Sequence, residues 1–188
     1  ARRLGGLLAN EALRLDQSAA AEEPVETISY QVFPVDLPLK RYREASYYQE
    51  EIRRRREAAE EQGLSPGEYR VRWTALQGAL REEESARHRP WAPARVICSL
   101  LTVNRHGFLF LPFELFSSLG GAISAAAPLD TTWIVGYRGD CLGYLPDEAG
   151  FDSAGYEAMS SRFAREAGRE FVGQVSAFLD RAAEKGGW

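Results

Sequence analysis

The chain has 188 residues, of which 45% are hydrophobic and 27% are charged, and its formal net charge at pH 7 is −4. This composition is typical of one globular domain with a sizeable core, and it excludes a disordered chain. The negative charge argues against a nucleic-acid-binding protein, and the longest apolar run, residues 108–113, is much too short to cross a membrane. No signal-peptide pattern opens the chain. It begins inside a helical pattern without a methionine, so we expect a fragment or a processed subunit.

The first forty residues predict a helix and then a strand. Leucines recur at helical spacing over residues 2–15, which predicts a helix that packs against the core. Residues 16–24 are rich in alanine and glutamate and predict a linker. Hydrophobic residues alternate over residues 26–39, but the alternation changes phase at Pro34. We therefore expect one strand that is interrupted or bulged near the proline.

Residues 43–88 predict a protruding hairpin of two helices. The first helix, at 43–62, sets glutamates and arginines four residues apart, which is typical of a solvated surface helix with ion pairs. Ser65 and Glu68 resemble a capping box, with Pro66 at the first position of the second helix.

The remaining pattern predicts an α/β fold with a mixed sheet flanked by helices. A β-branched apolar run is typical of a strand covered on both faces, and Asn-Arg-His-Gly after it predicts a hairpin turn. In chain order we expect a strand at 95–103, a turn at 104–107, a strand at 108–111, a helix at 115–126, a strand at 131–137, a loop up to residue 160 and a helix at 162–183.

Two polar side chains come where predicted strands end, which is where α/β folds usually build their sites. Glu114 lies at the start of the apolar helix, and Tyr144 lies in a Gly-Tyr-Leu-Pro turn. Glu114 could bind a metal or act as a helix N-terminal carboxylate stabilised by the helix dipole. Tyr144 could take part in a site or pack over the helix with its hydroxyl bonded to the backbone.

The sequence offers few other candidates for chemistry. It contains only His88 and His106, and neither stands in a metal-ligand pattern. Cys98 lies in a strand-like run and is expected in the core, while a bridge between it and Cys141 remains open. No phosphate-binding loop and no nucleophile elbow are present.

Three short motifs in order resemble the neutral/alkaline ceramidase family, specifically the later part of its zinc-bearing catalytic domain. They are Leu-Pro-Phe-Glu-Leu-Phe at 111–116, Gly-Tyr-Leu-Pro at 143–146 and Gly-Tyr-Glu at 155–157. The preceding strand, the helical insertion and the terminal helix also fall in the family's order. The resemblance implies that residues 1–188 form one region, similar to the C-terminal half of such a domain, with a helical insertion at about 43–88.

The resemblance implies that Glu114 and Tyr144 are zinc ligands. Two histidines would complete the site from an upstream segment or a second subunit, and the apolar surface left by that missing half should be a large interface. The implied activity is zinc-dependent hydrolysis of an amide, with a small-molecule or lipid-like substrate.

The chain departs from the family's motifs at three positions. Phe113 stands where the family has glycine, and Gly139 and Asp140 stand where it has an Asn-Gly turn. These three residues are candidate substrate-binding positions, at which a substrate other than long-chain ceramide is expected. The same departures support an alternative, a non-catalytic structural or regulatory subunit that keeps the fold without the chemistry.

Overall fold

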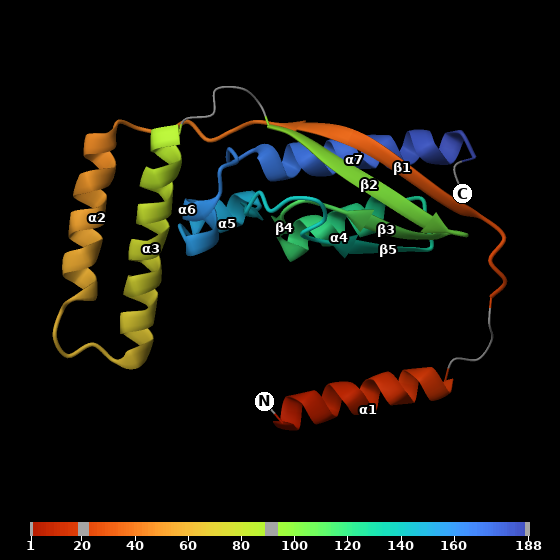
Figure 1. Cartoon of the computed structure of the whole chain (residues 1–188), viewed down its shortest axis with the longest axis horizontal. Helices are drawn as coiled ribbons and strands as arrows, with labels where there is room; N and C mark the ends of the chain where they lie inside the picture. The colour runs from red at the N-terminus through yellow and green to blue at the C-terminus, as the bar shows by residue number, and fades with distance from the viewer. Residues whose placement is uncertain (1, 19–22, 89–93, 187–188) are drawn as a thin grey trace.

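One mixed sheet organises the chain in the computed structural model, which describes residues 2–18, 23–88 and 94–186 (Figure 1). The neighbouring strands β1, β2 and β3 pair antiparallel, and β5 is added parallel to β3. The predicted α/β class with a mixed sheet is therefore confirmed. The four strands are β1 (Ile28–Leu37), β2 (Ala94–Val103), β3 (His106–Phe110) and β5 (Thr131–Val135).

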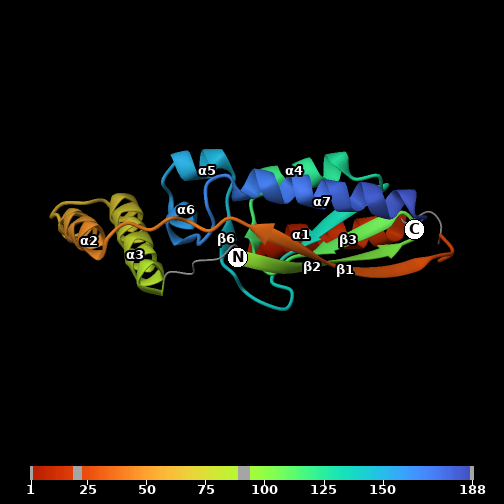
Figure 2. The same cartoon turned by 90° about the horizontal axis from the view of Figure 1, so that it is seen from above.

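Two helices cover one face of this sheet and form the core with it (Figure 2). The helix α4 (Ser117–Ala126) lies between β3 and β5 in the chain, and α7 (Ala167–Glu184) packs on both α4 and β1. Phe171, Val175 and Leu179 of α7 are fully buried, and their spacing of four residues places them on one side of the helix. The predicted terminal amphipathic helix is thus confirmed, although it begins later than expected.

The other elements are short or lie outside the sheet. The region predicted as a loop up to residue 160 instead contains a two-residue strand and two short helices, so that prediction was wrong. These elements are α1 (Arg2–Ser18), α2 (Ala45–Ala59), α3 (Pro66–His88), β4 (Glu114–Leu115), β6 (Tyr144–Leu145), α5 (Glu148–Asp152) and α6 (Tyr156–Ser160).

The predicted helical hairpin is confirmed and projects from one end of the sheet as α2 and α3 (Figure 1). Its capping box is present, because the backbone N–H of Ser65 donates to Glu68 Oε2 at 2.9 Å and the N–H of Glu68 donates to Ser65 Oγ at 3.3 Å. The base of the hairpin is tied to α6 through Lys40. Its ammonium group donates to Glu82 of α3 at 3.2 Å and to the Ala158 carbonyl of α6 at 2.9 Å.

Strand β1 runs without the predicted bulge. All ten of its residues pair with β2 in one register, from Ile28 opposite Val103 to Leu37 opposite Ala94. Pro34 is tolerated because β1 is an edge strand of the sheet. The hydrophobic alternation changes phase for another reason, since apolar residues occupy the uncovered face in the first half of the strand and the core face in the second.

The second face of the sheet is covered by no helix among the described residues, and it carries several exposed apolar side chains beside the Arg95–Asp36 ion pair. Ile28 on β1 is 69% exposed, and Trp133 on β5 is 48% exposed. Ile97 on β2 is also exposed, so the prediction that this strand is covered on both faces was wrong. We call this surface the open sheet face, defined by Ile28, Tyr30, Val32, Ile97, Phe108 and Trp133.

The N-terminal helix α1 is present as predicted, but the packing predicted for it is wrong. Each of its described residues is exposed, including Leu8 at 73%, and Figure 1 shows the helix apart from the sheet. The apolar stripe of α1 and the open sheet face therefore both lack a covering partner within the described residues.

The helix α7 packs closely against the chain after β6 at Gly168. A Cβ atom there would lie 2.6 Å from the Pro146 carbonyl oxygen, whereas a Cβ atom at Gly173 of the same helix would meet nothing within 4 Å. We expect Gly168→Ala to lower the free energy of unfolding by about 1–3 kcal/mol, because the backbone must move. Gly173→Ala should raise it by about 0.5–1 kcal/mol through helix propensity. Urea unfolding measures both, and equal effects would contradict this close approach.

Candidate functional site

The short parallel pair β4–β6 places the two predicted site residues side by side. Glu114 lies opposite Tyr144 in its register, and the backbone N–H of Glu114 donates to the Gly143 carbonyl at 2.9 Å. Glu114 belongs to a strand, and Phe116 is the N-cap of α4, which has no acidic residue in its first turn. The alternative of a helix N-terminal carboxylate was therefore wrong.

A loop over residues 136–143 interrupts the parallel pairing just before this point. The chain leaves β5 after Val135, whose carbonyl accepts from the Leu111 N–H at 2.8 Å, and pairing resumes when the Leu142 N–H donates to the Pro112 carbonyl at 2.7 Å. Within the loop Tyr137 has a φ of 59° and Gly139 a φ of 82°. Left-handed backbone is unusual for a tyrosine, and such residues concentrate at functional sites.

Glu114 interacts with two phenols rather than one. The hydrogen bond with the Glu114 side chain raises the pKa of Tyr137 to about 12. Burial raises the pKa of Tyr144, and the negative charge of Glu114 and a hydrogen bond with it act in the same direction. Both tyrosines are therefore held in the protonated form beside the carboxylate. We call Glu114, Tyr137 and Tyr144 the carboxylate–phenol cluster.

Tyr137 is the member of this cluster that the sequence did not indicate. The available signal was its position two residues after β5, at the carboxyl end of a strand parallel to β3. Its side chain is 58% exposed, so it faces solvent as well as Glu114.

A pocket of about 650 Å³ opens beside the cluster. Glu114 and Tyr144 line this pocket, and Arg81 and Ser85 of α3 also line it. Arg162, which follows α6, completes the charged lining. A second hollow of about 450 Å³ is lined by Glu114 and Tyr137, so the carboxylate borders two cavities.

The three predicted substrate-binding residues lie at different places. The Phe113 ring is fully buried and packs edge-on against Phe163 and Phe171, so it belongs to the core. Gly139 and Asp140 are exposed on the loop that carries Tyr137, and neither lines the two cavities beside Glu114. The structure thus brings together Glu114 and Tyr144 and leaves these three outside the pocket that they share.

His106 and Cys98 lie outside the cluster, whereas Cys141 lines the pocket that Glu114 and Tyr144 share. His106 bonds Thr131 Oγ1 at 2.8 Å through Nδ1. Cys98 is fully buried, as predicted, and burial raises the pKa of its thiol to about 12. Both cysteines are free. Over residues 2–18, 23–88 and 94–186, no three His, Cys, Asp or Glu side chains gather as a metal site.

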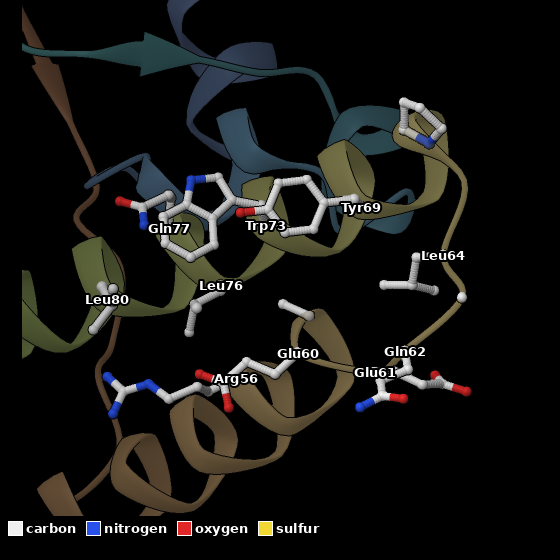
Figure 3. Close-up of a pocket in the computed structure, with 13 residues that line it drawn as sticks. Arg56, Glu60, Glu61, Gln62, Leu64, Tyr69, Trp73, Leu76, Gln77 and Leu80 are labelled. Carbon is white, nitrogen blue, oxygen red and sulfur yellow. The ribbon is translucent and has the colours of Figure 1, made fainter.

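A larger hollow, of about 730 Å³, lies on the helical hairpin and is separate from Glu114. Figure 3 shows the Tyr69 and Trp73 rings of α3 above Arg56 and Glu60 of α2. The two rings stack with centroids 6.1 Å apart. This hollow is lined by neither Glu114 nor Tyr144, so it is not the site that the sequence predicts.

Comparisons with known proteins add little to this geometry. No protein-family model matches the chain, and no curated protein matches it. Two solved structures resemble part of it, a neutral ceramidase from Pseudomonas aeruginosa and a ceramidase complexed with C2. Each is 17% identical, covers 51% of this chain and 16% of the ceramidase chain, and has a TM-score of 0.44. At these values the likeness carries no argument, so the chemistry of the site rests on its residues.

The described helices include none with both the length and the apolar character needed to span a bilayer.

The carboxylate–phenol cluster predicts a late tyrosine titration. Glu114→Gln removes the negative charge, so the pKa of Tyr137 should fall from about 12 toward the ordinary value of 10.0. Absorbance at alkaline pH measures this, with Tyr137→Phe to assign the transition and the exposed Glu170→Gln as a charge-matched control. Because the folded pKa is raised, the stability it contributes is present below pH 10.0 and is lost as the pH rises toward about 12. An unchanged titration in Glu114→Gln would contradict the cluster.

Proposed function

We propose that this chain supplies Glu114 and Tyr144 to a zinc site in an amide hydrolase that resembles neutral ceramidase. The observation that carries the proposal is the register of β4 and β6, which sets a carboxylate and a phenol opposite each other at the ends of parallel strands. The perturbed pKa of Tyr144 supports it, because active sites are where such perturbations concentrate.

The proposed site needs ligands from outside the described residues. Catalytic zinc usually takes three protein ligands and leaves one position open, and no third His, Cys, Asp or Glu side chain joins Glu114 here. Histidines from an upstream segment or a second subunit would complete the set. Tyrosine is a less usual ligand, and the hydroxyl of Tyr144 would have to lose its proton to bind.

Zinc held there would supply a water of lowered pKa and would polarise the amide carbonyl. Glu114 and Tyr144 would contribute oxygen donors, and burial together with the charge of Glu114 raises the pKa of the Tyr144 hydroxyl. The Tyr137 hydroxyl lies beside the same carboxylate, where it would donate its one proton to Glu114. Overall the C–N bond would break, the water oxygen would join the acyl carbon as a carboxylate, and the amine would leave as an ammonium ion that takes both protons of the water.

The open sheet face is the proposed docking surface for the segment that carries the histidines. Its apolar side chains lie on neighbouring strands, and exposed patches of this kind mark interaction sites. The loop of the site reaches this surface, because Arg138 hydrogen-bonds the Tyr30 hydroxyl. A partner on this face would therefore contact the residue next to Tyr137.

Metal analysis tests the proposed zinc site. The chain alone should hold little zinc, and the chain mixed with the histidine-bearing segment should hold a stoichiometric amount. Glu114→Gln and Tyr144→Phe should lose most of it, while Glu170→Gln should lose none. Zinc affinity should rise with pH, because Tyr144 must give up a proton. An assembly that forms without zinc and without amide hydrolysis would favour the non-catalytic, structural role instead.

A charge on the open sheet face tests the docking surface. Ile97→Asp should leave the fold of the chain intact, because this side chain is 48% exposed. It should weaken association with the histidine-bearing segment by about tenfold or more, since a carboxylate would be buried in an apolar contact. Ala177→Asp, at an exposed position of α7 on the other side of the sheet, adds the same charge and is the matched control. Equal association of both variants would exclude this face.

A further inference from the structure

We propose that the pocket beside the carboxylate–phenol cluster selects amides that carry a carboxylate group, and that Arg162 recognises this carboxylate. This inference rests on the proposed hydrolase function and names its substrate class. Arg162 lines the same pocket as Glu114 and Tyr144, so one ligand can contact all three residues.

Most of the residues that line this pocket are of polar or charged type. Its aromatic members are all tyrosines, and Leu142 is the one aliphatic side chain among the described residues that form it. Sites for long acyl chains are lined mostly by apolar side chains, because burial of each methylene group drives binding. The walls that this chain provides therefore suit a small polar amide. The remaining lining residues are Tyr42, Arg81, Glu84, Ser85, Glu114, Cys141, Gly143, Tyr144, Tyr156, Ser160 and Arg162.

The backbone at Arg162 is held in place relative to Tyr144. Ser161, its buried neighbour, donates from Oγ to the Tyr144 carbonyl at 2.8 Å. The carbonyl of Arg162 accepts from the Lys40 N–H at 2.8 Å, and Phe163 on its other side is fully buried. The start of the Arg162 side chain is thus at a defined distance from β6, which lowers the cost of ordering it on a ligand.

Among the described residues, Arg162 is the cation of this pocket that pairs with no carboxylate. Arg81 forms an ion pair with Glu84 at 3.4 Å. The nearby Lys40 ammonium forms an ion pair with Glu82 and donates hydrogen bonds to carbonyls of α6. Arg162 forms no ion pair with a carboxylate of the described residues, and its charge acts on the Tyr42 hydroxyl.

The charges also orient such a ligand. A guanidinium binds a carboxylate through two parallel hydrogen bonds, which fixes direction as well as position. Glu114 repels the carboxylate, so the anionic end lies at Arg162 and the neutral amide lies at Glu114 and Tyr144. The carboxylate can belong to the amine half or to the acyl half of the amide, and both place an anion at Arg162.

Binding to the chain tests this inference with three related aryl amides. N-benzoylglycine has its carboxylate on the amine half, 4-(methylcarbamoyl)benzoate has it on the acyl half, and N-methylbenzamide has none. By ligand-observed NMR, at least one of the two anions should bind about tenfold or more tightly than the neutral amide. Arg162→Gln should remove that preference and Arg162→Lys should keep part of it. Arg169→Gln, an exposed arginine on α7 outside the pocket, should change nothing. Equal binding of all three amides, or of the anions to Arg162→Gln, overturns the inference.

The outcomes separate this inference from the proposed function. In one case, the chain prefers the anions through Arg162 while its assembly with the partner segment never holds zinc. That result supports the carboxylate site and overturns the hydrolase. In the opposite case, the zinc-loaded assembly cleaves N-methylbenzamide as fast as both anions, and Arg162→Gln changes none of these rates. That result supports the hydrolase and overturns the carboxylate site.

Discussion

The parallel pairing of residues 106–116 with residues 131–145 is the constraint on which the candidate site depends. It begins as β3–β5, breaks at the loop 136–143 and resumes as β4–β6. The same two chain segments are hydrogen-bonded on both sides of the break, so the position where they rejoin is set. Glu114 consequently lies opposite Tyr144, and the inserted loop brings Tyr137 to the same carboxylate. The geometry of the cluster is thus a property of strand register and not of the exposed side chains alone.

The loop that completes the cluster also links it to the open sheet face. Two consecutive residues of this loop make the link. Tyr137 interacts with Glu114 of the cluster, and Arg138 donates a hydrogen bond to the Tyr30 hydroxyl on the open sheet face. Among the described residues, no helix covers the open sheet face, and the loop that carries Tyr137 reaches this face through Arg138.

The helical hairpin affects the pocket as well as the outline of the molecule. It is anchored on α6 through Lys40, and Gly78 on α3 lets the Met159 side chain approach closely. The end of α3 thereby becomes a wall of the pocket beside Tyr144, with a paired arginine and polar side chains. An insertion that reads in sequence as a solvated surface element therefore sets part of the chemistry that a ligand would meet.

Local patterns predicted most of the elements, because helix spacing, the capping box at Ser65 and the turn at Asn104 depend on near neighbours in the chain. They also pointed to Glu114 and Tyr144, since both follow strands. The sequence placed α1 in the core and a bulge at Pro34, and both errors have one cause. An apolar stripe shows that a surface prefers burial, but it does not show whether a partner within the described residues covers it.

The sequence by itself thus determined most of the element types, the α/β class and two residues of the candidate site. Only the tertiary structure decided that Glu114 lies in a strand, that Tyr137 joins it, that Phe113 is a core residue and that Arg162 borders the pocket. The physical reason is that these facts depend on strand register and on contacts between segments far apart in the chain, which no local period encodes.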